Sequence, residues 1–241
     1  MGSNGTIILW DLRPDAIPGS PLEEKMKQFT LVLILAVFLS GCSAMAADLN
    51  ASAAVQPGNV LFKDDFSDPS SGWETWSEPS GSMVAYQNGG LRIYIAEKQF
   101  DFWSRPGKRI SDVRLEVDAI KLGGPDDNDF GLICRYQDRD NFYAFLGSSD
   151  GYTGILKVKE GKYQLISSKQ MVYSDSIRKG GAQNHIRADC TGSTLSLYAN
   201  GQKIASVEDQ DFKMGEIGII AGTGVAGGAD LYFDNFWAYK P

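Results

Sequence analysis

A period of two in the hydrophobic residues is the feature that most constrains the fold. In the range 113–119, apolar residues alternate with Arg114, Glu116 and Asp118, as expected of a strand with one buried face. The same pattern recurs in the ranges 91–95, 130–136, 142–146, 154–158, 163–166, 185–190, 195–198 and 231–239. No stretch after Asn59 has a sustained helical period. The sequence therefore predicts an all-β domain.

Three dipeptides between these runs indicate how the strands connect. Asn88-Gly89, Glu160-Gly161 and Asn200-Gly201 each separate two strand-like segments. Two-residue hairpin turns need positive φ angles, which asparagine and glycine adopt most readily. Short strands joined in this way predict an antiparallel sandwich or barrel rather than a parallel sheet.

Residues 26–42 have the order of a bacterial secretory signal. A cationic start is followed by the apolar run 31–39, which is much shorter than the roughly 20 residues of a membrane-spanning helix. The sequence Leu-Ser-Gly-Cys at 39–42 resembles the lipobox of bacterial lipoprotein precursors. That resemblance implies cleavage before Cys42 and attachment of a lipid anchor to its thiol, at the cell envelope. The alternative is ordinary secretion, with cleavage after Ala-Met-Ala at 44–46.

The signal also divides the rest of the chain. Residues 1–25 do not fit in front of it, because a signal peptide carries its charge at the very N-terminus. We predict that they are an unstructured lead from a mis-assigned start and that Met26 is the true first residue. Residues 43–58 are mostly Ala, Ser, Asn and similar small residues, which predicts a flexible linker. The range 59–241 is then the folded β-sandwich domain.

Charge and cysteine content exclude some partners. The formal net charge is −7, and no basic cluster is present, which argues against a nucleic-acid ligand. Beyond Cys42 the cysteines are Cys134 and Cys190. In an exported protein two thiols favour a disulfide over a zinc site, which would need four ligands where this chain has one histidine. We predict a Cys134–Cys190 bridge.

Four segments carry a resemblance to a known superfamily. They are Asp-Asp-Phe-Ser-Asp at 64–68, Phe-Gly-Leu-Ile-Cys-Arg-Tyr at 130–136, Leu-Tyr-Ala-Asn-Gly at 197–201 and Phe-Asp-Asn-Phe at 233–236. In this order they resemble the concanavalin A-like jelly-roll domains of bacterial surface proteins, a group with laminin-G-like, 3-keto-disaccharide hydrolase-type and laminarinase-type members. The resemblance covers nearly all of 61–239. It implies two curved antiparallel sheets, adjacent first and last strands, and a concave face that often holds carbohydrate.

Sugar recognition needs aromatic faces and planar polar groups in a mostly preformed groove. On the concave face we expect Trp103, Arg135, Tyr143, Asp150 and Tyr152 in that role. Each of them is also compatible with a place in the core or at the rim.

Catalytic candidates are weaker. The range 116–121 reads Glu-Val-Asp-Ala-Ile-Lys and resembles the Glu-x-Asp-x-x-Glu motif of laminarinase-type hydrolases, which would make Glu116 the nucleophile and Asp118 its neighbour. Retaining hydrolysis needs two carboxyl groups, but the acid/base position is Lys121. A solvent-facing strand is the simpler interpretation. His185, the single histidine, is expected to be a half-exposed strand residue rather than a base.

Calcium is a further possibility suggested by the fold resemblance. Asp65 and Asp234 are the expected ligands of a structural cation where the first and last strands meet. The acidic loop 123–129 lacks the regular ligand spacing of a calcium loop, so we interpret it as a polar turn.

Three functional hypotheses follow. The first is a surface-tethered, non-catalytic carbohydrate-binding or adhesion module whose partner is a glycan or another envelope component. The second is a hydrolase of glycosides or keto-sugars on the same fold, with its acids among Glu116, Asp118, Asp138, Asp140 and Asp150. The third is an envelope scaffold protein. Fold alone does not decide between them.

Overall fold

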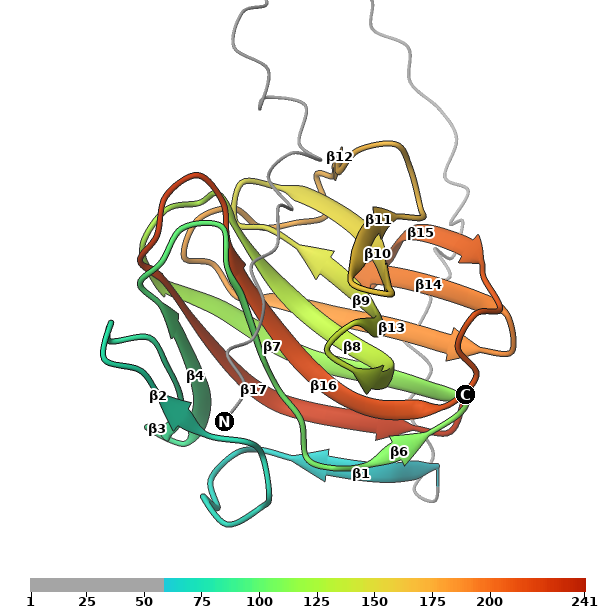
Figure 1. The fold of residues 1–241 in the computed structure, drawn as a ribbon, viewed down its shortest axis with the longest axis horizontal. Coiled ribbons are helices and arrows are strands. Elements are labelled where there is room, and N and C mark those ends of the chain that lie inside the picture. The colour runs from blue at the N-terminus through green and yellow to red at the C-terminus, as the bar shows by residue number, and fades with distance from the viewer. Residues whose placement is uncertain (1–58) are drawn as a thin grey trace, which may run out of the picture.

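The computed structural model describes residues 59–241, which form two stacked antiparallel β-sheets (Figure 1). This confirms the predicted all-β, two-sheet class. The predicted lead, signal peptide, lipidated Cys42 and linker lie outside the described residues. Within 59–241, no helix is long and apolar enough to cross a membrane.

The nine-stranded sheet lies farther from the viewer in Figure 1. Its strands, in spatial order, are β15 (Gln202–Glu208), β14 (Thr194–Ala199), β13 (Asn184–Thr191), β7 (Val113–Gly123), β17 (Ala229–Tyr239), β4 (Gly90–Ile95), β3 (Met83–Gln87) and β2 (Trp76–Ser77). A ninth strand, β1 (Val60–Asp64), pairs with β17. The first and last strands of the domain are therefore neighbours, as the superfamily resemblance implied.

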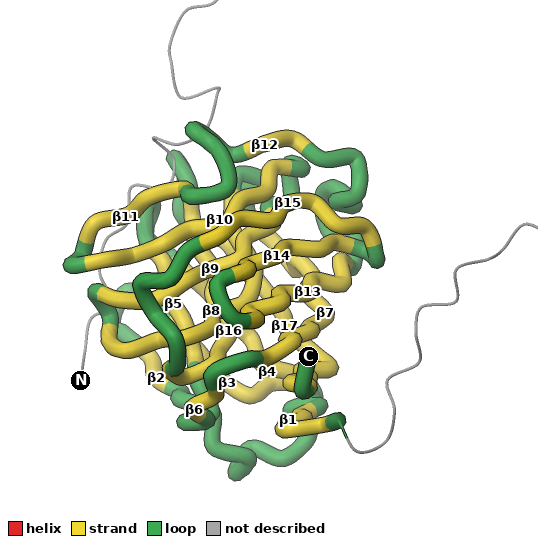
Figure 2. Tube along the Cα trace, turned by 90° about the vertical axis from the view of Figure 1, so that its right-hand side faces the viewer, coloured by secondary structure: helices red, strands yellow, loops and turns green. Residues whose placement is uncertain are grey.

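The eight-stranded sheet lies nearer the viewer. Its order is β11 (Lys162–Leu165), β10 (Tyr152–Lys159), β9 (Asn141–Gly147), β8 (Asn128–Asp138), β16 (Gly215–Thr223) and β5 (Asp101–Ser104). Two short strands extend it, with β12 (Val172–Tyr173) on β10 and β6 (Arg109–Ile110) on β16. Figure 2 shows both sheets from the side, with strands and loops as the only elements drawn in the described part.

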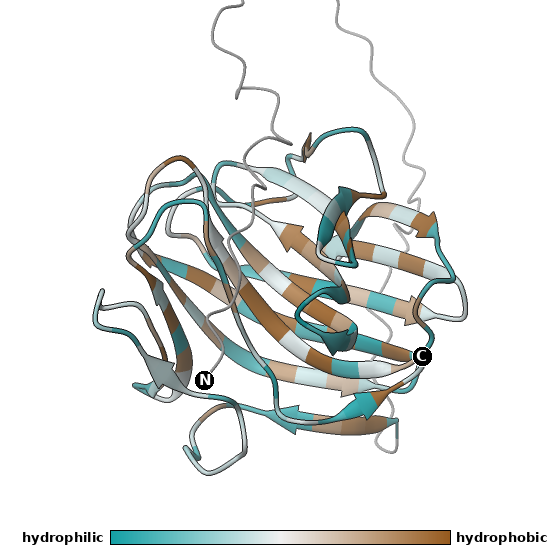
Figure 3. Cartoon of the chain, in the orientation of Figure 1, coloured by the Kyte–Doolittle hydropathy of each residue, from teal (hydrophilic) through white to brown (hydrophobic). Residues whose placement is uncertain are grey.

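The main hydrophobic core fills the space between the two sheets. Alternate residues of β7, among them Val113, Leu115 and Val117, are fully buried there. Residues of β8 and β16 face them from the other sheet. Figure 3 shows the corresponding alternation of hydrophilic and hydrophobic residues along the strands. Burial of apolar surface on this scale is the dominant force that holds such a sandwich together.

The hairpin predictions are confirmed in conformation as well as in position. Asn88, Glu160 and Asn200 have φ angles of 53°, 52° and 49°, and each is followed by a glycine that also has positive φ. These turns connect β3 to β4, β10 to β11 and β14 to β15. The glycine requirement of the turn type explains why these dipeptides were readable from the sequence.

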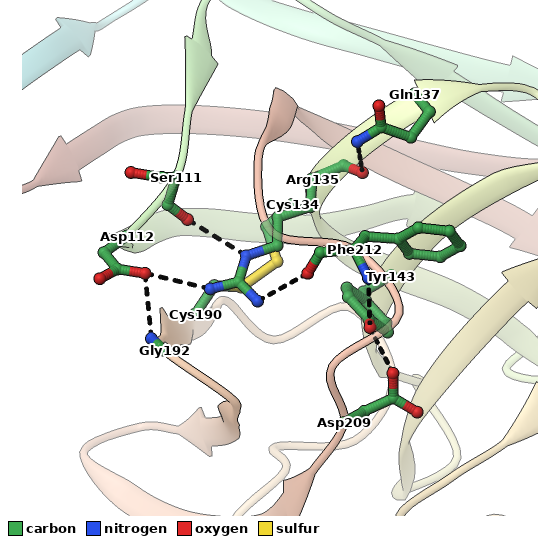
Figure 4. Close-up of a disulfide and its surroundings, with 10 residues drawn as sticks. All are labelled: Ser111, Asp112, Cys134, Arg135, Gln137, Tyr143, Cys190, Gly192, Asp209 and Phe212. Atoms are coloured by element: carbon green, nitrogen blue, oxygen red, sulfur yellow. Dashed lines mark hydrogen bonds and ion pairs between the residues drawn. A yellow bond between two sulfur atoms is a disulfide. The ribbon is translucent and has the colours of Figure 1, made fainter.

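The predicted disulfide is also confirmed. Cys134 on β8 is bonded to Cys190 on β13, with their Cα atoms 6.9 Å apart (Figure 4). The two strands belong to different sheets, so the bridge ties the layers of the sandwich together through the core.

Candidate functional site

The outer face of the eight-stranded sheet carries a second hydrophobic cluster, separate from the core between the sheets. It contains Trp103 from β5, Phe142 from β9 and Ile220 from β16, all buried. The Trp103 ring centroid lies 5.4 Å from that of Phe142 and 6.1 Å from that of Tyr136. Side chains from the β11–β12 segment also join this cluster, including Leu165.

A row of polar side chains crosses the same face at one end of this cluster. Asp101 on β5 is paired with Gly222 on β16, and Gly222 with Asp129 on β8. The row continues through Ser148, just after β9, to Tyr152 at the start of β10. Because residues two apart along a strand share a face, this row lies immediately beside Trp103.

Gly222 allows the two carboxylates to approach each other across β16. A Cβ atom added at Gly222 would collide with Oδ1 of Asp101 and would lie 3.4 Å from Cβ of Asp129. The carboxylate of Asp101 therefore occupies space above β16 that is free only because residue 222 is a glycine. Both aspartates are almost fully buried, with exposed fractions of 2% and 1%. Buried carboxylates are costly and therefore more informative than buried apolar groups.

Tyrosines and a third carboxylate lie at the rim of this row. The hydroxyl of Ser148 donates to Oδ1 of Asp150, and the half-buried ring of Tyr152 meets that of Tyr173 edge-on at 5.9 Å. Burial, and in second place the charge of Asp101, raise the pKa of Tyr163 above its usual range. Its phenol stays protonated to a higher pH than that of an ordinary tyrosine and can both donate and accept a hydrogen bond.

The structure does not bring Arg135 to this surface. Its side chain is 1% exposed and runs to one end of the sandwich, where the guanidinium donates to the carbonyls of Ser111 and Phe212 and pairs with Asp112 at 3.1 Å (Figure 4). Arg135 lies at an irregularity in the β8–β9 pairing and has a φ angle of 55°. A β-bulge redirects a side chain in this way, which simple alternation does not predict.

Tyr143 also points away from the predicted site. Its ring lies in the core between the sheets, its hydroxyl donates to Asp209, and the backbone N–H of Phe212 donates to that hydroxyl at 3.1 Å. Phe142, its neighbour on β9, is the residue that faces outward. The prediction that Trp103, Arg135 and Tyr143 converge on one surface is therefore wrong. Along β9 the alternation of the two faces was predicted correctly, but the faces were assigned the wrong way round. Trp103 and Tyr152 do lie on one face, with Asp150 hydrogen-bonded to Ser148 of the row beside them.

Glu116 and Asp118 lie on the outer face of the other sheet and form a cluster with the single histidine. His185 Nδ1 lies 2.9 Å from Oδ1 of Asp118, and its Nε2 lies 3.6 Å from Oε2 of Glu116. The hydrogen bond to Asp118 is the largest cause that raises the pKa of His185 to about 9, followed by that to Glu116. The imidazole is therefore a cation at neutral pH and a poor general base. Lys121 is bonded to the carbonyl of Gly124 and to Asp126.

The expected calcium ligands lie near each other without forming a ready cation site. Oδ1 of Asp65 accepts the backbone N–H and the hydroxyl of Ser67, while Oδ1 of Asp234 accepts the N–H of Asn235. Burial, and next the charges of Asp118 and Asp65, raise the pKa of Asp234. No group of three or more His, Cys, Asp or Glu side chains in residues 59–241 is arranged to hold a metal ion.

Comparison with known proteins gives the fold and no family. No family model matches the chain, and no curated protein matches its sequence. Among solved structures, a carbohydrate-binding module, CBM66 from Bacillus subtilis, is similar over 70% of this chain and 95% of its own, at 18% identity and a TM-score of 0.54. A Bacillus subtilis protein of unknown function with a galectin-like fold is similar over 77% of this chain and 97% of its own, at 11% identity and a TM-score of 0.58. A β-1,3-glucanase from Mycobacterium marinum is similar over 76% of this chain and 100% of its own, at 14% identity and a TM-score of 0.52.

Sequence reasoning missed Asp101, Asp129 and Gly222. Two of them lie on β5 and β16, strands that were not predicted. β16 reads Gly-Glu-Ile-Gly-Ile-Ile-Ala-Gly-Thr and is buried along nearly its whole length, so it has no polar alternation to detect. The glycines next to buried apolar residues were the available signal, because glycine inside a strand often marks a close approach of neighbouring groups.

Proposed function

We propose that this protein is a non-catalytic glycan-binding module that is tethered to the bacterial cell envelope by a lipid on Cys42. The polar row on the outer face of the eight-stranded sheet carries the proposal. It places Asp101, Asp129 and Ser148 in line across neighbouring strands, beside the aromatic rings of Trp103 and Tyr152.

The chemistry of the row matches that of a sugar. Carboxylates accept hydrogen bonds from vicinal hydroxyl groups, while serine and tyrosine hydroxyls both donate and accept. Of the aromatic rings beside the row, the half-buried ring of Tyr152 offers the apolar surface on which the C–H face of a pyranose packs, while Trp103 itself is buried. Small-ligand sites typically have a small number of polar groups that converge beside an aromatic surface.

Two further observations support this function. Solved structures with the same two-sheet fold include a protein named a carbohydrate-binding module and another named a β-1,3-glucanase. The lipobox resemblance at 39–42 and the Cys134–Cys190 disulfide fit an exported, surface-held protein, where glycans are abundant partners.

Glycan-array screening of the full-length protein, followed by calorimetry on the best glycan, tests the proposal. Asp129→Asn should weaken binding about tenfold or more, since a hydrogen bond to a charged group contributes roughly 1.5–3 kcal/mol. Asp138→Asn is the matched control, because Asp138 lies at the opposite end of the same strand and should leave affinity unchanged. Failure of the wild-type protein to bind any glycan, or an equal loss in both variants, contradicts the proposal.

A hydrolase is the second candidate, and one observation favours it. Asp101 and Asp129 flank Gly222 on the outer face, and a pair of carboxyl groups is what hydrolysis of a glycoside requires. Release of reducing ends from the bound glycan, abolished separately by Asp101→Asn and Asp129→Asn while binding persists, would establish this alternative. Binding without turnover in the wild-type protein leaves the module as the function.

A further inference from the structure

A separate pocket lies on the opposite side of the molecule, where the first and last strands of the domain meet. Its volume is about 260 Å³, and it is lined by Lys63, Asp64, Asp65, Asn235 and Trp237. These residues come from β1, the turn after it and β17 of the nine-stranded sheet. The pocket shares no residue with the polar row described above.

The pairing of β1 with β17 builds this pocket. Lys63 is in register with Trp237, and Asp64 with Phe236, which places Asp65 beside Asn235. A bulge between Asp234 and Trp237 interrupts the pairing of β17 with β7. Asn235, inside the bulge, has a φ angle of 52°. Asparagine tolerates positive φ better than most residues with a Cβ, and a bulge of this kind re-aims the side chains around it.

The indole of Trp237 forms an aromatic wall. Tyr239 stacks on it with a centroid separation of 5.6 Å and an interplanar angle of 6°. Asn235 lies two residues before Trp237 on the same strand, and both residues line the pocket. The ammonium of Lys63 stands 5.4 Å from the indole centroid, at the outer limit of a cation–π contact. The stacking holds the ring in one orientation, so the wall is preformed.

Three polar groups at the pocket retain hydrogen-bonding capacity. Nζ of Lys63 makes no hydrogen bond within the described part of the chain. Oδ1 of Asp65 is engaged by Ser67, whereas its Oδ2 has no partner among residues 59–241. Nδ2 of Asn235 donates to Oδ2 of Asp118 at 3.0 Å, which orients the amide and leaves its Oδ1 as an acceptor. The ammonium can donate several hydrogen bonds, and the two oxygens can accept them. Together with the neighbouring indole they complement the hydroxyl groups of a sugar ring.

We propose that this pocket binds one neutral monosaccharide unit, as a second site that does not depend on the proposed site on the other sheet. Its volume is just below the roughly 300–1,000 Å³ of pockets for drug-sized ligands, which favours a single ring. Asp64 and Asp65 oppose an anionic ligand by like-charge repulsion. Lys63 beside the indole opposes a cationic one.

Nuclear magnetic resonance of the full-length protein, labelled with nitrogen-15 and kept in EDTA, tests the proposal. The probes are the methyl glycosides of glucose, galactose, mannose and xylose. At least one should shift the Trp237 indole N–H signal saturably at millimolar concentration. Trp237→Ala, followed through backbone signals of β1, should weaken this binding about tenfold, which corresponds to about 1.4 kcal/mol. Trp237→Phe should retain part of the affinity.

Two variants separate loss of binding from loss of folding. Asn235→Gly keeps the positive φ angle accessible and removes the acceptor, so it should weaken binding in a protein that remains folded. Tyr198→Ala is the matched control: Tyr198 lies on the same outer face, with Arg187 and Lys203 at 4.2 Å and 5.5 Å from its ring. It should leave binding unchanged.

The outcomes distinguish this pocket from the proposed site on the other sheet. Asp129→Asn should leave the Trp237 shift intact, and Trp237→Ala should leave Asp129-dependent glycan binding intact. The inference is overturned if none of the four glycosides shifts the Trp237 signal. It is also overturned if Tyr198→Ala weakens binding as much as Trp237→Ala.

Discussion

The outer faces of the two sheets differ in almost every respect, although the same alternation of residues generates both. On the eight-stranded sheet the outward side chains are mainly apolar and buried, such as Phe142 and Ile220. On the nine-stranded sheet they are ionic: Arg92 pairs with Asp230 at 2.6 Å, and Arg187 with Asp189 at 2.5 Å. One sheet is packed on both faces, and the other is packed on one face only.

Because of this difference, a polar side chain indicates a candidate functional site more clearly on one sheet than on the other. Charged residues on the nine-stranded sheet neutralise one another near solvent, where such pairs contribute little. Asp101 and Asp129 are buried next to an apolar cluster, where a carboxylate is costly to retain unless hydrogen bonds compensate its burial. Burial therefore distinguishes the carboxylates of the eight-stranded sheet from the more solvent-exposed ion pairs of the other.

Truncation of an outward aromatic residue on each sheet tests this contrast most directly. We expect Phe142→Ala to lower the free energy of unfolding by about 3–5 kcal/mol, since it empties a buried site. Tyr198→Ala, on the outer face of the nine-stranded sheet, should cost less than about 1 kcal/mol, because surface changes of this kind are mild. Urea denaturation monitored by circular dichroism measures both. Equal losses would show that the two faces are not energetically different.

Removal of the disulfide tests how strongly the two sheets depend on each other. Cys134 and Cys190 are 56 residues apart in sequence, and a bridge that closes a long loop typically contributes about 2–4 kcal/mol. The double variant Cys134→Ala/Cys190→Ala should lose about that much. The wild-type protein in reducing agent serves as the comparison and should lose a similar amount. Unchanged stability in both would mean that core packing alone holds the sheets together.

A variant of Arg135 tests whether this residue binds glycan, as the sequence suggested, or stabilises the fold, as its buried contacts indicate. Arg135→Met keeps the apolar stem but leaves the carbonyls of Ser111 and Phe212 without their donor. Because buried acceptors without partners are costly, we expect a loss of about 1–3 kcal/mol of unfolding free energy. Glycan affinity, measured below the unfolding transition, should not change. A selective loss of affinity with unchanged stability would restore Arg135 to the binding site.

The sequence predicted those parts of the fold in which one face of a strand meets solvent. In β7 and β13 charged residues alternate with buried ones, so both the period and its phase were readable. The hairpins at Asn88, Glu160 and Asn200 were readable because their backbone conformation restricts residue type. The disulfide followed from the number of cysteines and the expected export.

The candidate site was mostly not predictable, for a physical reason. A sheet that is packed on both faces has no polar side to set the phase, as in the neighbouring pair Phe142 and Tyr143. The bulge at Arg135 then redirects a side chain that strict alternation would point elsewhere. The row at Gly222 depends on the register of β16 with β5 and β8, a long-range arrangement with no local signal.

The smallest expected effect concerns the charged face, where His185 lies against Asp118 and Glu116. Its pKa in the folded protein is raised to about 9, against an ordinary value of 6.5. The stabilisation is therefore fully present below pH 6.5 and is lost as the pH rises through 9. The side chain is 42% exposed, so we expect no more than about 1 kcal/mol. Urea unfolding of wild type and His185→Gln should differ by this amount at pH 6 and converge by about pH 10. The single histidine allows an unambiguous nuclear magnetic resonance titration, and a midpoint near 6.5 would show that this face does not hold the imidazolium.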